Sequence, residues 1–125
     1  MRLLLDSNAL IWAYERPSEL SPAARMAIED TANERFVSMA SLWEIAIKAS
    51  IGKLSLTGDL ARAVDHLAVV PVSIQLDEVL RVQKLPLHHR DPFDRMMIAQ
   101  AIEEGLTIVT RDRAFRAYGV PLLAA

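Results

Sequence analysis

Four acidic residues, far apart in the chain, occupy positions where carboxylates can act together. They are Asp6, Glu44, Asp94 and Asp112. Four carboxylates in one cleft repel each other and raise each other's pKa. A hard divalent cation removes that penalty, and ligands that offer only oxygen select Mg²⁺ or Mn²⁺ rather than zinc. If the fold brings these residues together, they predict a metal site that activates water and cleaves phosphodiesters.

Three of these acids also have a structural explanation. Asp6 and Asp112 each precede a short helical segment and can act as its N-cap. Asp91 is the natural N-cap of a helix that begins at Pro92, which places Asp94 at N3, where an acid suits the helix dipole. Capping alone does not explain why each acid either follows a strand or lies near the start of a helix that begins at a strand's carboxyl end. This shared placement favours a common cleft.

Glu44 has two structural explanations of its own. It can close a capping box with Ser41 as the N-cap. It can also form an ion pair with Lys48, one helical turn away. Taken alone, Glu44 is therefore better explained by structure than by chemistry.

The elements that must position these acids alternate along the chain. Apolar runs predict five strands, at residues 2–5, 35–38, 68–73, 107–109 and 120–122. Helical patterns, with Ser21 as one N-cap and Gly52 and Gly105 as C-terminal stops, predict helices at residues 9–14, 22–31, 41–51, 59–67, 76–84, 92–104 and 113–117. Pro71 inside the third run indicates a sheet edge. Apolar strands separated by helices predict a doubly wound parallel α/β sheet, which binds ligands at the carboxyl ends of its strands.

Composition limits the classes of protein to which this chain can belong. Its 125 residues, 52% of them hydrophobic and 24% charged, suit one folded domain over residues 1–125. The absence of cysteine excludes a disulfide framework, a thiolate zinc site and a cysteine nucleophile. No apolar run approaches the ~20 residues of a membrane helix. We therefore expect a cytoplasmic protein without a membrane partner.

Charge permits a nucleic-acid substrate without requiring one. The net charge of −2 alone argues against such a partner. With the four candidate metal ligands set aside, 14 basic residues remain against 12 acidic ones. Most of the basic residues are arginine, whose guanidinium group binds phosphate through two parallel hydrogen bonds.

Three basic residues near the acids have alternative roles. Arg95 directly follows Asp94 and Arg111 directly precedes Asp112, so both suggest phosphate contacts. Neighbouring side chains on a helix point about 100° apart, so adjacency does not establish convergence. Lys48 either contacts phosphate or pairs with a carboxylate.

Aromatic residues and histidines near the acids also have two readings. Trp12 and Trp43 can stack on nucleic-acid bases, but a core position or contact with a partner protein is favoured. His88 and His89 are a pair that can run acid–base RNA cleavage without metal. Consecutive residues in a loop seldom face one target, so this alternative is disfavoured.

Four segments match one family pattern in order. They are residues 4–12 (LLDSNALIW), 41–48 (SLWEIAIK), 89–101 (HRDPFDRMMIAQA) and 109–112 (VTRD). Together they resemble the PIN domain family and, within it, the VapC-like toxin ribonucleases of type II toxin–antitoxin systems. The resemblance runs from residue 1 to about residue 122.

The resemblance implies a fold, an activity and a site. The fold is a three-layer α/β/α sandwich with a five-stranded parallel sheet, and the activity is that of a Mg²⁺- or Mn²⁺-dependent endoribonuclease that cleaves RNA by metal-activated water. A homodimer and a cognate antitoxin that occupies the cleft are also implied. The implied catalytic and metal-binding residues are Asp6, Glu44, Asp94 and Asp112, with Thr110 beside them.

Some positions depart from the family pattern or support the site only indirectly. Ser7 stands where many relatives have threonine, and Asn8 stands where this branch often has histidine. Asn8, Lys48 and Arg95, like Thr110, are supporting or substrate-binding candidates.

Two other classes of function remain open from the residues. A receiver-like phosphotransfer domain also uses acids at strand ends with Mg²⁺, but Asp6 is followed by Ser7 and Asn8 rather than by a second acid, and no lysine follows Lys84. A non-catalytic PIN scaffold is the other alternative, and the presence of all four acids weighs against it.

Overall fold

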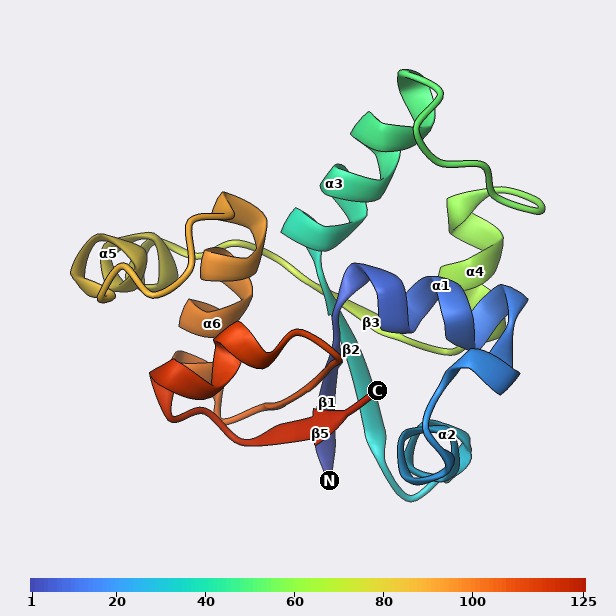
Figure 1. Ribbon diagram of the computed structural model, residues 1–125, viewed down its shortest axis with the longest axis horizontal. Helices are drawn as coiled ribbons and strands as arrows, with labels where there is room; N and C mark the ends of the chain where they lie inside the picture. The colour runs from blue at the N-terminus through green and yellow to red at the C-terminus, as the bar shows by residue number, and fades with distance from the viewer.

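A five-stranded, all-parallel sheet lies at the centre of the computed structural model, which describes residues 1–125 (Figure 1). Its strands are β1 (Arg2–Leu5), β2 (Glu34–Ser38), β3 (Val70–Val72), β4 (Thr107–Thr110) and β5 (Leu122–Ala124). They are arranged in the order β3-β2-β1-β4-β5, so the chain changes direction across the sheet between β1 and β4. Receiver domains have the order β2-β1-β3-β4-β5 instead, so the receiver alternative is wrong.

Helices cover both faces of this sheet (Figure 1). They are α1 (Ser7–Glu15), α2 (Pro22–Glu29), α3 (Met39–Ser50), α4 (Leu60–His66), α5 (Leu76–Lys84) and α6 (Pro92–Glu104), with short 3₁₀ helices η1 (Pro17–Glu19) and η2 (Arg113–Tyr118). This confirms the expected three-layer sandwich. None of the helices is long and apolar enough to span a bilayer.

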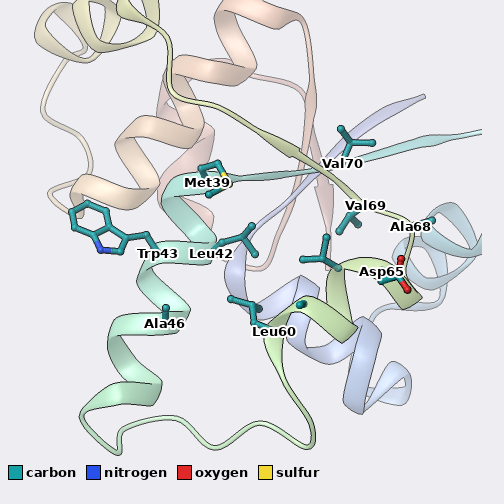
Figure 2. A pocket seen from close by; sticks show the side chains of 11 residues that line it. Met39, Leu42, Trp43, Ala46, Leu60, Asp65, Ala68, Val69 and Val70 are labelled. Atoms are coloured by element: carbon teal, nitrogen blue, oxygen red, sulfur yellow. The ribbon is translucent and has the colours of Figure 1, made fainter.

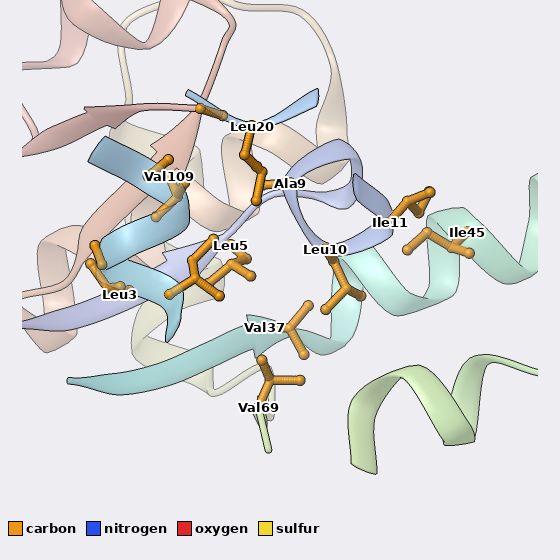
Figure 3. Close-up of a cluster of buried hydrophobic side chains, with 14 of the residues drawn as sticks. Leu3, Leu5, Ala9, Leu10, Ile11, Leu20, Val37, Ile45, Val69 and Val109 are labelled. Carbon is orange, nitrogen blue, oxygen red and sulfur yellow. The ribbon is translucent and has the colours of Figure 1, made fainter. Parts of the chain in front are cut away.

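The strand side chains alternate between two separate cores. Leu3 and Leu5 of β1 pack with Val109 of β4 into the larger core, under α1, α2 and α3 (Figure 3). Leu4, between the first two, joins the second core with Ile108, under α6 and η2. Each fully buried leucine stabilises the fold by roughly 1.5–3 kcal/mol relative to an exposed one. Because both faces are covered, the strand is apolar after Arg2, as its sequence indicated.

Several helix ends lie where the sequence predicted them. The Ser21 hydroxyl accepts a hydrogen bond from Ala24 N–H at 3.0 Å and caps α2. Asp91 caps α6, and Gly105 ends α6 with φ at 68°, in the left-handed region that glycine adopts at little cost. The helix over residues 76–84 has the predicted bounds, and β3 with Pro71 lies at the sheet edge.

Several predicted boundaries are wrong by two residues. The first helix begins at Ser7 rather than at residue 9, α2 ends at Glu29 rather than at residue 31, and β3 begins at Val70 rather than at residue 68. The helix expected from Ser41 begins at Met39, because Ser38 at the end of β2 caps it by accepting a hydrogen bond from Ala40 N–H at 3.0 Å. The last strand was expected at residues 120–122 but is β5, Leu122–Ala124. Pro121 has no N–H to donate, so only its carbonyl contributes to the sheet, and the regular strand begins after it.

Candidate metal centre

The fold gathers the four acids at the carboxyl edge of the sheet. Asp6 directly follows β1, and Asp112 follows β4 after one intervening residue. Glu44 comes from the second turn of α3, and Asp94 comes from the first turn of α6. The Asp6 N–H donates to the carbonyl of Val109 at 3.1 Å, which joins the ends of the two strands. The acids lie at the place where the strand order reverses, which is where such sheets bind ligands.

Asp6 is a largely enclosed carboxylate at the end of β1. Burial raises its pKa above the usual range, and the charges of Glu44 and Asp112 raise it further. Hydrogen bonds from the Thr110 side chain and from Ala9 N–H, the latter at 2.8 Å, oppose this rise. Asp6 is thus both the N-cap of α1 and a member of the acid cluster.

Asp94 shows the same conflict between burial and charge. Burial, followed by the charge of Asp91, raises the pKa of Asp94 from 3.8 to about 7. Glu44 and Asp6 contribute in the same direction, while His89 lowers the pKa. Because Asp6 and Asp94 each respond to the charge of Glu44, the acids share one electrostatic environment. Their role as metal ligands remains a prediction.

Glu44 is held by donors at the edge of the cluster. The Ser7 hydroxyl donates to its Oε1 at 2.7 Å, and Lys48 Nζ lies 3.2 Å from its Oε2. The ion pair with Lys48 is confirmed. The capping box with Ser41 is wrong, because α3 begins two residues earlier and the buried Ser41 hydroxyl has no partner.

His89 joins the cluster, a position that its place in the sequence did not predict. Its Nε2 lies 3.0 Å from Asp94 Oδ2 and 2.9 Å from Asp112 Oδ2. Burial raises the pKa of Asp112, but hydrogen bonds from Ala114 N–H and from His89 outweigh it, and the net pKa is lowered. His88 instead lies edge-on to the Tyr118 ring, 5.2 Å between centroids. The two histidines therefore do not face one target, and the metal-free mechanism finds no support.

Thr110 links two of the acids. Its buried hydroxyl accepts a hydrogen bond from Asp112 N–H at 3.1 Å and also bonds to the Asp6 side chain. Asn8, in the first turn of α1, is exposed. Thr110 therefore has the contacts of a supporting residue, while the role of Asn8 remains a prediction.

The Arg95 guanidinium group faces protein oxygens. It donates five hydrogen bonds, to the carbonyls of Val82, Leu85, Pro86 and His89 and to the Tyr118 hydroxyl. These bonds tie the end of α5 and the following loop to α6. Of the two roles predicted for Arg95, the contacts favour a supporting one over phosphate binding.

Arg111 is also engaged within the chain. It donates to the carbonyls of Glu19 and Ala125 and lies over the ring of Trp12, 4.1 Å from its centroid. Its predicted phosphate contact therefore competes with three internal contacts. Trp12 is partly buried against the larger core, as favoured over base stacking.

An apolar groove lies between α3 and α4 (Figure 2), and α3 also carries Glu44 of the acid cluster. It has a volume of about 970 Å³, and ten of its eleven lining residues are hydrophobic. Trp43, with 62% of its surface exposed, borders the groove and contacts the Phe93 ring edge-on at 5.5 Å. This exposure excludes the core position, one of the two favoured interpretations of Trp43, and contact with a partner protein, the other one, remains a prediction.

The acid cluster fits a hard divalent cation. Asp6 and Asp94 are partly buried carboxylates with raised pKa values, so their negative charge lacks full compensation within the protein. The surrounding ligand atoms are carboxylate and hydroxyl oxygens, the donors that Mg²⁺ and Mn²⁺ prefer. His89, Asp94 and Asp112 also offer atoms that lie within 4.8 Å of one another.

Sequence comparison places this geometry among known proteins. The profile of the PIN domain family matches residues 3–121. The chain is 36% identical to Ribonuclease VapC22 from Mycobacterium tuberculosis (strain ATCC 25618 / H37Rv), in a match covering 95% of this chain and 93% of the relative.

Solved structures share the fold at lower identity. VapBC2 from Rickettsia felis, bound to a DNA fragment from their promoter, matches with a TM-score of 0.71, 15% identity and coverage of 98% of both chains. FitAcB from Neisseria gonorrhoeae matches with a TM-score of 0.59, 19% identity, and coverage of 98% of this chain and 96% of that one. These structures support the α/β arrangement described above.

Proposed function

Because this chain belongs to the PIN domain family, we propose that it is a metal-dependent endoribonuclease and the toxin of a toxin–antitoxin pair. The observation that carries the proposal is the gathering of four acids from four elements at one edge of the sheet. Capping explains the position of a single acid but not their shared electrostatic environment. The 36% identity to a protein named a ribonuclease supports RNA as the substrate.

The residues divide into ligands and supports. Asp6 and Asp94 are the proposed direct ligands of Mg²⁺ or Mn²⁺, with Glu44 and Asp112 completing the negative pocket. The bound ion supplies charge neutralisation and activates water for attack on phosphorus. Ser7 and Lys48 hold Glu44 in place through contacts of 2.7 Å and 3.2 Å, respectively.

A second groove offers a path for the RNA strand. It has a volume of about 470 Å³, and Thr110 and Asp112 of the acid cluster form part of its lining. Arg113 and Arg116, both exposed, lie along the same groove. Two cations beside the acids favour the binding of phosphates that flank the cleaved bond.

The apolar groove between α3 and α4 is the proposed contact for the antitoxin. Its exposed hydrophobic surface suits a partner segment with an apolar face. The groove and the acid cluster share α3, so a partner bound in the groove reaches the cleft over a short distance. Figure 2 shows Met39, Leu42, Trp43 and Ala46 along the α3 side of the groove.

The proposed homodimer has a candidate surface on α5. Leu76, Val79 and Leu80 form an exposed apolar stripe at helical spacing, with Leu76 exposed by 73%. We expect Leu80→Glu to convert a dimer to a monomer in sedimentation experiments. A dimer that persists in Leu80→Glu places the contact elsewhere.

The test of the activity is cleavage of RNA by purified protein. We expect cleavage with Mg²⁺ or Mn²⁺, and its loss when EDTA is added. Asp77→Asn, which changes an exposed acid outside the cluster, is the matched control for Asp6→Asn and retains activity. Cleavage that is unaffected by EDTA contradicts the metal mechanism. Absence of cleavage with every metal and RNA tried favours a non-catalytic scaffold.

A further inference from the structure

We propose that His89 is a positioning residue of the metal centre, which bridges Asp94 and Asp112 and holds these carboxylates at a spacing suited to a divalent ion. This inference rests on the proposed metal-dependent function. The two acids come from different elements, the first turn of α6 and the segment after β4. The imidazole Nε2 lies 3.0 Å and 2.9 Å from their respective Oδ2 atoms. A single side chain therefore connects two parts of the cluster.

The hydrogen bonds assign the proton on the ring. Nδ1 of His89 accepts a hydrogen bond from Asp91 N–H at 3.1 Å, so the hydrogen of the neutral imidazole resides on Nε2. Nε2 therefore donates toward the two carboxylates. A histidine binds a metal ion through an unprotonated nitrogen. If Nε2 were unprotonated in the neutral ring, the hydrogen would lie on Nδ1 and would point at the Asp91 N–H, which is itself a donor. The observed contacts thus favour His89 as a hydrogen-bond donor rather than as a ligand.

The ring is held by contacts that do not involve the acids. The backbone N–H of His89 donates to the Tyr118 hydroxyl at 2.7 Å, and the backbone carbonyl of His89 accepts from Arg95 at 3.3 Å. The imidazole lies edge-on to the ring of buried Phe115, 5.6 Å between centroids. The position of the imidazole is therefore set by contacts that are independent of the two carboxylates.

Donation from Nε2 leaves the acids able to bind a cation. Each carboxylate oxygen has two lone pairs, so one oxygen can accept a hydrogen bond and also coordinate an ion. The bridge also reduces the repulsion between two oxygens that converge on one point. Partners of this kind orient metal-binding side chains, and their removal weakens metal binding by about 10–100-fold.

Mn²⁺ affinity, measured by titration of the metal-free protein, tests the bridge. We expect His89→Ala to weaken Mn²⁺ binding by about 10–100-fold, and His89→Gln, whose amide also donates, to recover part of the loss. His88→Ala is the matched control and keeps the wild-type affinity. Thermal unfolding of each variant verifies that it is folded. Equal or tighter binding by His89→Ala overturns the inference, since tighter binding means that the imidazole competes with the ion.

Pulsed electron paramagnetic resonance of the Mn²⁺-loaded wild type separates positioning from ligation. We expect no hyperfine coupling from a directly coordinated nitrogen. Such a coupling assigns His89 as a ligand and overturns the inference. A wild type that binds no Mn²⁺ defeats the proposed function together with this inference, whereas wild-type binding that His89→Ala leaves unchanged defeats the inference alone.

Discussion

The acid cluster and the apolar groove lie on two sides of one helix and differ in almost every physical property. Glu44 of α3 belongs to the cluster, whereas Met39, Leu42, Trp43 and Ala46 line the groove. The groove residues follow the spacing of one helical face, and Glu44 is turned about 100° from its neighbour Trp43. One surface concentrates negative charge and the other is apolar. Cation binding and partner binding should therefore be separable by mutation, although they share an element.

The largest expected effect is the loss of cleavage when a proposed ligand is changed. Asp6→Asn or Asp94→Asn should lower the rate of RNA cleavage by more than ~100-fold, since removing a ligand should exceed the effect of removing its supporting partner. The groove is untouched, so antitoxin binding should change far less than the cleavage rate. Rates come from single-turnover cleavage assays. Full activity in either variant removes that acid from the mechanism.

The converse change should affect only partner binding. Trp43→Ala removes an exposed aromatic side chain from the groove and should weaken antitoxin binding by roughly 10–100-fold, as loss of an aromatic anchor does. The partner to use is the small protein encoded immediately upstream, where one exists. RNA cleavage should change little.

Met26→Ala provides the matched control for this experiment. Met26 is an exposed apolar residue of α2 that does not line the groove. Binding should be unaffected. Equal loss of binding in both variants contradicts the assignment of the groove.

The metal-free protein should become more stable as the pH falls from about 8 to about 5. The raised pKa of Asp94, about 7, means that its buried carboxylate destabilises the folded state above that pH. Protonation relieves this cost as the pH falls through the folded pKa toward the ordinary value of 3.8, below which the side chain is protonated in both states.

Comparison of the wild type with Asp94→Asn isolates this contribution. Because asparagine carries no charge, the variant should lack this pH-dependent contribution. After allowance for solvent screening, its free energy of unfolding should exceed that of the wild type by about 1–2 kcal/mol at the higher pH. Chemical denaturation at each pH measures the difference. A difference in the free energy of unfolding that does not vary with pH contradicts the proposed cause. Mutation of groove residues should leave this pH dependence intact.

The smallest effect concerns the ion pair on α3. Lys48→Ala removes a partner at 3.2 Å from Glu44, but the lysine side chain is half exposed. Exposed pairs at this helical spacing contribute about 0.3–0.5 kcal/mol. Thermal unfolding should therefore shift only slightly. A large loss of stability means that Lys48 compensates the charge of the cluster more strongly than its exposure indicates.

Local signals in the sequence were sufficient for much of the fold. Ser21-Pro22 and Asp91-Pro92 begin helices, and Gly105 ends one, because each acts through bonds to residues within a few positions. The start of α3 was missed because two serines, Ser38 and Ser41, both qualify as N-caps, and only the extent of β2 decides between them.

The candidate site was harder to predict from the sequence than the fold. Parallel strands bring their carboxyl ends to one edge, so the approach of Asp6 and Asp112 follows from the topology. The position of His89 depends on Tyr118, which is 29 residues away, and no spacing rule connects them. Arg95 was also ambiguous, since its five acceptors lie on segments that only the folded chain brings together.

The most direct test of the central claim is equilibrium dialysis of metal-free protein against Mn²⁺, with wild type, Asp6→Asn and Asp77→Asn in parallel. The account predicts saturable binding by the wild type and by Asp77→Asn, and a large loss of affinity in folded Asp6→Asn. Equal binding by all three proteins, or no binding by the wild type, contradicts the assignment of the acid cluster as a metal centre.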